Sequence, residues 1–129
     1  MSEQDEFYLR PVLCVADVSA STAYYCDKLG FQRSWQSPEQ EPIIAQVGRN
    51  GLDLILDSSS SIPRARIPSV LSMSLHDSHG LDELYQEFSR RGATTQGPPS
   101  EVSWQQGVVQ FEVLDLDGNI LVFWGDTPG

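Results

Sequence analysis

VLCVADVSASTAYYCDKLGF (residues 12–31) and VLSMSLHDSHGLDELYQEFSRRG (residues 70–92) follow the same order of elements in this 129-residue chain. Each stretch begins with the alternation of a strand and continues with the periodicity of a helix. A glycine, Gly30 or Gly92, then marks the end of the expected helix. Further strand-like stretches follow each copy. Such an internal repeat predicts that the chain folds as two copies of one supersecondary unit.

The first copy predicts one helix and four strands. We expect a strand over residues 8–16 that lies at a sheet edge or at a sheet seam, because Pro11 has no N–H to donate. A helix is expected over residues 19–29, with Asp17 or Ser19 as its N-cap. Its expected core-facing side chains are Ala23, Tyr24, Cys26 and Leu29. Strands are expected over residues 31–36, 43–47 and 52–57, the last two joined by an Asn50-Gly51 turn.

The second copy predicts a strand over residues 70–76 and a helix over 78–91. That helix has a stripe of apolar side chains, Leu81, Leu84, Tyr85 and Phe88. A polar loop over 97–106, with or without a short strand in it, precedes strands over 108–114 and 120–124, which flank a turn at 115–119. We therefore expect a single domain over 1–129, with a disordered arm (1–6), modules over 7–57 and 69–125, and a linker over 58–68.

These elements predict an α+β fold. One helix and about four strands cannot cover both faces of a sheet. Two βαβββ repeats side by side are therefore expected to form a cupped mixed sheet with the helices on its convex face. The concave face is left open for a ligand.

The amino-acid composition limits the classes of molecule that this protein is expected to bind. Eight basic residues against eighteen acidic ones give a formal net charge of −10. That charge argues against nucleic acid and either favours a cationic ligand or serves only solubility. No apolar run has the length of a membrane helix, and the first residues lack the features of a secretory signal. Two cysteines, Cys14 and Cys26, are expected to be buried spectator thiols, and we expect a cytoplasmic protein.

Several short motifs resemble one superfamily. Residues 11–18, PVLCVADV, precede Tyr24-Tyr25 and Leu29-Gly30-Phe31, and the chain closes with VLDLDGN at residues 113–119. This order resembles the vicinal oxygen chelate superfamily, which includes glyoxalase I, extradiol dioxygenases, fosfomycin-resistance enzymes and bleomycin-resistance proteins. The resemblance supports the fold and leaves the activity open.

The enzymes of that superfamily hold a divalent metal through His and Glu side chains on four strands. The resemblance places Arg10, Ile55, Val70 and Val122 at these positions. A guanidinium cation cannot ligate a metal, and the three aliphatic side chains have no donor atom. We therefore expect no metal and no other cofactor. His76 and His79 do not have the spacing of a helical metal site.

The resemblance then points to the metal-free bleomycin-resistance branch, whose dimers confer antibiotic resistance by sequestering a cationic glycopeptide in pockets that both subunits form. It implies a homodimer that binds a small-molecule ligand, such as a cationic drug, at its interface. The candidate ligand-binding residues are Trp35, Asp53, Ser72, Trp104, Glu112, Val122 and Trp124. Two alternatives remain: a metal-independent lyase or isomerase with Glu112 as its base, and a regulatory domain without a dedicated ligand.

Overall fold

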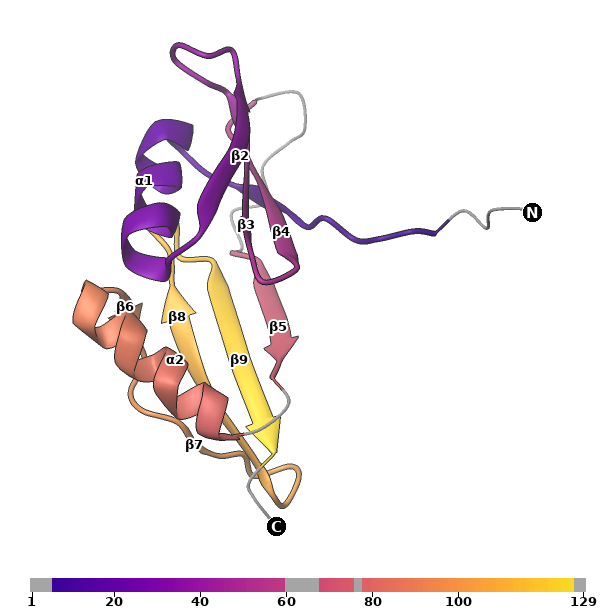
Figure 1. Ribbon diagram of the computed structural model, residues 1–129, viewed down its shortest axis with the longest axis vertical. Helices are drawn as coiled ribbons and strands as arrows, with labels where there is room; N and C mark the ends of the chain where they lie inside the picture. The colour runs from indigo at the N-terminus through magenta and orange to yellow at the C-terminus, as the bar shows by residue number, and fades with distance from the viewer. Residues whose placement is uncertain (1–5, 60–67, 76–77, 127–129) are drawn as a thin grey trace.

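Two similar modules make up the fold (Figure 1). The structure is a computed structural model that describes residues 6–59, 68–75 and 78–126, and it leaves the side chains of residues 78 and 79 undescribed. The expected arm and the expected linker fall largely outside these ranges. Neither described helix is long and apolar enough to cross a membrane.

The first module contains one helix and a four-stranded mixed sheet. Its elements are β1 (Val12–Cys14), α1 (Val18–Leu29), β2 (Gln32–Ser37), β3 (Ile44–Arg49) and β4 (Leu52–Asp57). The strand order is β1-β4-β3-β2, with β1 parallel to β4 and the other pairs antiparallel. The expected edge position of the first strand is therefore confirmed.

The second module repeats this arrangement with two additional short strands. Its elements are β5 (Val70–Ser74), α2 (Ser78–Arg91), β6 (Thr94–Thr95), β7 (Ser100–Glu101), β8 (Val108–Leu114) and β9 (Ile120–Asp126). The strand order is β5-β9-β8-β6, with β7 also paired to β8. As in the first module, the first strand is parallel to the last, β5 to β9. The expected pair of βαβββ-like modules is confirmed.

Local signals place both ends of α1 correctly. The side chain of Asp17 accepts a hydrogen bond from the backbone N–H of Ala20, which confirms one of the two expected N-caps. Gly30 ends the helix in the left-handed conformation, at φ 71°. The Asn50-Gly51 turn also has positive φ at both residues, as expected.

The expected core face of α1 is right for Leu29 and wrong for Ala23 and Tyr24. Ala23 is exposed and Tyr24 is half-buried, whereas Tyr25 is fully buried. The buried residues of the helix are Val18, Ser21, Thr22, Tyr25 and Leu29. One further expectation needs correction, because β1 covers only residues 12–14. The short strand β7 lies in the expected loop, where a short strand is one of the alternatives.

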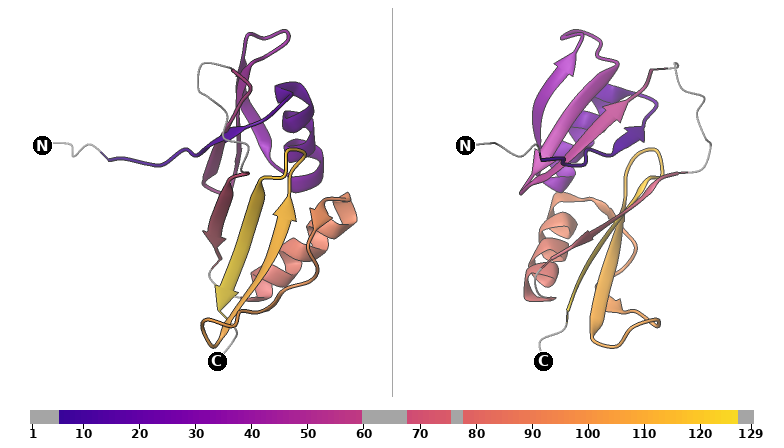
Figure 2. Two further views of the ribbon diagram at one scale, coloured as in Figure 1. Left: turned by 180° about the vertical axis from the view of Figure 1, so that it is seen from behind. Right: turned by 90° about the vertical axis from the view of Figure 1, so that its right-hand side faces the viewer.

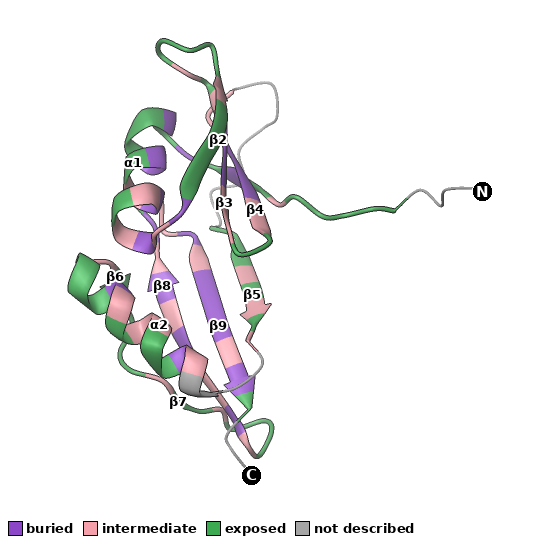
Figure 3. Cartoon of the chain, in the orientation of Figure 1, coloured by how far each residue is buried: buried purple, intermediate pink, exposed green. Residues whose placement is uncertain are grey.

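The two modules lie one above the other along the long axis of the molecule, with both helices on the same side (Figures 1 and 2). Within the described residues, α1 and α2 contact each other, while no strand of one sheet contacts a strand of the other. Most of the buried hydrophobic residues form one core cluster, and Figure 3 shows buried positions on both helices and on the strands that the helices contact. Each sheet therefore has one helix-covered face and one helix-free face.

Candidate functional site

The helix-free face of the second sheet brings five of the seven candidate residues together. Leu121 and Phe123 of β9 are core residues, so Val122 and Trp124 point to the opposite face. The strand register places Ser72, Val122 and Glu112 in one row across β5, β9 and β8. The next row contains Ser74, Trp124 and Gln110. Trp104 joins these rows from the loop between β7 and β8.

Two indoles form the most distinctive contact on this face. The rings of Trp104 and Trp124 meet edge to face, with 5.8 Å between their centroids and 70° between their planes. Trp104 remains 62% exposed, so a large aromatic surface stays accessible to water. Trp124 supports it from the sheet. The pair therefore leaves indole surface accessible to a flat ligand.

The other two candidate residues lie on the helix-free face of the first sheet. The register places Val12, Ile55, Gln46 and Trp35 in one row across β1, β4, β3 and β2. Asp53 lies in the neighbouring row, opposite Gly48. A Cβ atom at Gly48 would collide with the carboxylate of Asp53, so this glycine makes room for the acidic side chain.

Exposed apolar side chains gather on these two faces. By strand register, Val12 and Trp35 belong to the first face and Val70 to the second, and Trp104 lies against Trp124. Their exposed fractions are 51%, 39%, 60% and 62%, respectively.

The same faces are acidic. Strand alternation places Asp53 and Asp57 on the first face, and Glu112 and Asp126 on the second. Arg10, immediately before β1, is the one cation that the described residues contribute to them, and it donates a hydrogen bond from Nη1 to Oε1 of Gln46 at 3.0 Å. The arrangement suits a ligand that carries positive charge.

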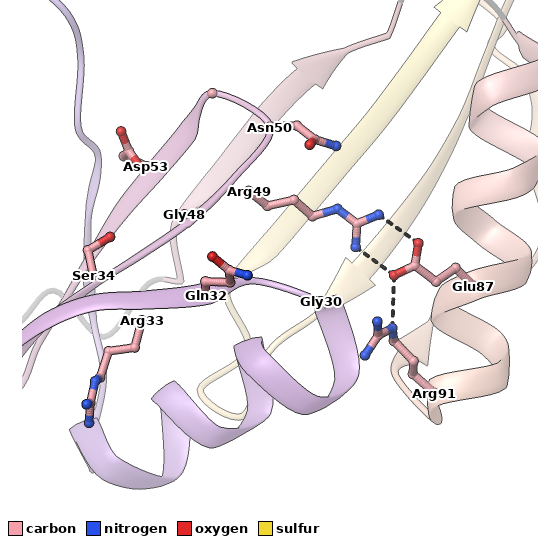
Figure 4. Close-up of a pocket in the computed structure, with 11 residues that line it drawn as sticks. Gly30, Gln32, Arg33, Ser34, Gly48, Arg49, Asn50, Asp53, Glu87 and Arg91 are labelled. Atoms are coloured by element: carbon pink, nitrogen blue, oxygen red, sulfur yellow. Dashed lines mark hydrogen bonds and ion pairs between the residues drawn. The ribbon is translucent and has the colours of Figure 1, made fainter.

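Two hollows of the described chain lie between the modules, and Asp53 lines the first of them. One polar basin of about 780 Å³ is lined by residues of both modules, including Arg33, Arg49, Asp53 and Glu87. Figure 4 shows the guanidinium groups of Arg49 and Arg91 turned toward the carboxylate of Glu87. Two bonds of 2.7 Å join Arg49 to Glu87, so the basin is built around an ion-pair network that joins the modules.

This network controls the ionisation of its carboxylate. The hydrogen bonds from Arg49 hold the pKa of Glu87 below its ordinary value, and Arg91 adds to the effect. Because Glu87 accepts hydrogen bonds from both guanidinium groups, we interpret this basin as a structural joint. A second, apolar hollow of about 290 Å³ between the modules is lined by residues such as Met73, Leu84 and Phe123.

The residues present do not fit the divalent metal of the related enzymes. Ile55, Val70 and Val122 lie on the helix-free faces and offer no donor atom, and Arg10 is a cation. In the described part of the chain, no three His, Cys, Asp or Glu side chains are placed to share an ion. His76 and the side chain of His79 lie outside that part.

The expectation of two buried thiols is wrong for Cys14. It is exposed because it lies on the helix-free face of an edge strand, whereas Cys26 in α1 is half-buried. Burial raises the pKa of the Cys26 thiol, which disfavours the reactive thiolate. Sequence reasoning also missed Gln46 and Gln110. Gln46 alternates with the core residues Ala45 and Val47, and that alternation is the signal that could have identified it.

Comparisons with known proteins agree with this architecture. A family model described as the Glyoxalase/Bleomycin resistance protein/Dioxygenase superfamily matches residues 8–123. The chain belongs to this superfamily. A search of curated proteins gives no significant match.

Solved structures of the superfamily share the fold at low sequence identity. A glyoxalase/bleomycin resistance protein/dioxygenase from Nocardioides is 18% identical, with a TM-score of 0.76 over 98% of this chain and 88% of that one. A protein so described from Alicyclobacillus acidocaldarius is 21% identical, with a TM-score of 0.74 over 95% and 91%. A superfamily member from Sphaerobacter thermophilus is 22% identical, with a TM-score of 0.72 over 94% and 98%. At these identities the likeness concerns the fold alone.

Proposed function

We propose that this protein sequesters a small aromatic or cationic molecule on its helix-free faces without altering it, as bleomycin-resistance proteins do. The observation that carries this function is the contact between Trp104 and Trp124 on an otherwise open, acidic face. Stacking on an indole contributes dispersion and apolar burial, and the face of the ring attracts cations. A flat cation would satisfy both the rings and the nearby carboxylate of Glu112.

A second copy of the chain is proposed to complete the pocket. Each helix-free face is a shallow surface in one chain, and a small-molecule site usually encloses most of its ligand. A two-fold axis would bring the first sheet of one copy against the second sheet of the other. Apolar side chains such as Val12 and Val70 would then leave water. The proposed site is therefore shared between two subunits.

The test is a thermal-shift screen of antibiotics, dyes and metabolites that includes bleomycin, followed by calorimetric titration of the best ligand. A ligand that binds only the native state raises the melting temperature. Trp104→Ala should weaken binding by about 1 kcal/mol or more at every salt concentration. The matched control is Leu116→Ala, which truncates an exposed apolar side chain in the turn between β8 and β9.

Titrations at low and high salt separate two contributions to affinity, the attraction between charges and the stacking on the indoles. The Debye length falls from about 10 Å at 0.1 M to about 3 Å at 1 M salt, so only the attraction between charges should weaken. Retained affinity at high salt that is lost in Trp104→Ala supports the proposal. Equal binding by Trp104→Ala and wild type contradicts it. Chromatography of the recovered ligand decides between sequestration and turnover by a metal-independent enzyme.

A further inference from the structure

Gln46 connects two side chains that come from different parts of the first module, Arg10 from the segment before β1 and Trp35 from β2. Its Oε1 accepts a hydrogen bond from Nη1 of Arg10 at 3.0 Å and another from Nε1 of Trp35 at 3.2 Å. A guanidinium and an indole can only donate. The amide of Gln46 must therefore turn its oxygen toward both partners, and this fixes the orientation of its NH₂ group.

The fixed orientation leaves hydrogen-bond donors without a partner. Gln46 is only 9% exposed, and its Nε2 has no acceptor among the described residues. Arg10 also keeps unused N–H groups, since its only other described contact is with the ring of Tyr8, 5.6 Å from the guanidinium carbon. Both side chains belong to the helix-free face. The first sheet thus presents N–H donors beside one fixed positive charge.

These donors do not suit a ligand that is only cationic. An ammonium group would be repelled by Arg10 and would offer no acceptor to Gln46. A carboxylate would accept from the guanidinium fork and from the amide together, and charge-assisted hydrogen bonds of this kind are strong. A dianion is disfavoured by the net charge of −10. The second sheet, in contrast, offers the carboxylate of Glu112 beside the two indoles.

We propose that the ligand is an aromatic zwitterion, whose carboxylate binds Arg10 and Gln46 while its ring and amine bind the indoles and carboxylates of the facing second sheet. This inference rests on the proposed function and deepens it. Arg10 and Gln46 are then specificity-determining residues. They select for a carboxylate in a site whose overall field favours cations.

Three probes with the same ring test this division of roles. They are 2-naphthylalanine, which is zwitterionic, 2-naphthylethylamine, which lacks the carboxylate, and 3-(2-naphthyl)propanoate, which lacks the amine. Calorimetric titration of the wild-type protein should show that naphthylalanine binds about tenfold tighter than either of the others. Equal affinity for the three probes, or binding of none, overturns the proposal.

Variants assign the preference to the two residues. Arg10→Met should abolish the preference for naphthylalanine over naphthylethylamine without weakening the binding of naphthylethylamine. Gln46→Glu keeps an oxygen for Arg10 and Trp35 but replaces the free NH₂ with an acceptor, so it should abolish the preference too. The matched control is Arg33→Met, an exposed arginine that interacts with Cys26 on the helix side of the sheet.

The outcomes of these titrations distinguish a failure of this inference from a failure of the proposed sequestration on which it rests. If Arg10→Met keeps the preference, the carboxylate does not bind there and the inference is wrong. If naphthylethylamine still binds and Trp104→Ala weakens it, the proposed sequestration stands without the zwitterion. Unfolding midpoints of all variants are measured alongside, so that a loss of affinity in a folded protein is the only result taken as support.

Discussion

The hydroxyl of Tyr25 in α1 donates a hydrogen bond of 2.9 Å to Oδ2 of Asp115, which follows β8 in the other module. Asp115 also accepts hydrogen bonds from the backbone N–H and the side-chain amide of Asn119. Nearby, Asp117 accepts a bond of 2.9 Å from the N–H of Ala16, just before α1. The turn between β8 and β9 therefore acts as a polar joint between the modules, and Tyr25 is its buried centre.

Removing the hydroxyl of Tyr25 should weaken this joint. Tyr25→Phe is expected to lower the free energy of unfolding by about 1 to 3 kcal/mol, because a buried carboxylate oxygen loses a donor. Urea unfolding followed by circular dichroism measures the change. Tyr85→Phe is the matched control, since its ring packs on Phe111 and its hydroxyl has no hydrogen bond within the described residues. Equal losses in both variants would contradict the role of the joint.

The same contact should make the protein sensitive to alkali. Burial, together with the charge of Asp115, raises the pKa of Tyr25 well above its ordinary value of about 10. The unfolded chain ionises this tyrosine near pH 10 while the folded chain keeps it protonated, so the stability it contributes is lost as the pH rises above that value. The difference in unfolding free energy between wild type and Tyr25→Phe should shrink between pH 9 and pH 11. A difference that stays constant would show that Tyr25 ionises equally in both states.

Local periodicity explains why much of the fold could be predicted. Apolar side chains at helical spacing, Leu81 to Phe88, predict α2, and alternation predicts β4 and β8. Tyr25 shows where that reasoning stops. Its burial depends on Asp115, which is 90 residues away in the chain, and no local pattern contains that contact. The spacing alone therefore placed Tyr24 in the core instead.

The residues of the candidate site also differ in how far local sequence patterns could predict them. Strand alternation is enough to place Val122, Trp124 and Glu112 on one face, because the period of a strand is two. The role of Gln46 depends on contacts with Arg10, from the segment before β1, and with Trp35, from β2. Such convergence follows from sheet order and register, which the sequence specifies only through long-range contacts.

The second joint between the modules should be sensitive to acid. The pKa of Glu87 is lowered chiefly by its hydrogen bonds from Arg49, so its contribution is present above the unfolded value of about 4.3 and is lost as the pH falls through the folded pKa. Glu87→Gln is expected to cost about 1 to 2 kcal/mol at pH 7 and less at pH 3.

Urea unfolding at both pH values checks this expectation for Glu87. Asp82→Asn is the control, because it removes one carboxylate from an exposed position of the same helix. A cost of Glu87→Gln that is the same at pH 7 and pH 3 would show that the ionised carboxylate does not stabilise the joint. A cost shared by Asp82→Asn would point to net charge instead.

A charge placed on the helix-free face should disrupt both assembly and binding. Val70 lies on β5 with 60% of its surface exposed in one chain, and the proposed dimer would bury it. Val70→Asp would then place an unpaired carboxylate in the interface. Light scattering should give twice the 14.3 kDa chain mass for wild type and a single chain mass for the variant. The thermal shift of any ligand found by screening should be lost with the dimer.

Leu116→Asp provides the control for Val70→Asp, because it adds the same charge at a similarly exposed apolar residue in the turn between β8 and β9. It should leave the mass and the thermal shift unchanged. A wild-type monomer at micromolar concentration would contradict the shared pocket. If Val70→Asp is monomeric yet keeps its ligand, one chain is sufficient for binding. That result would contradict a pocket shared between two subunits.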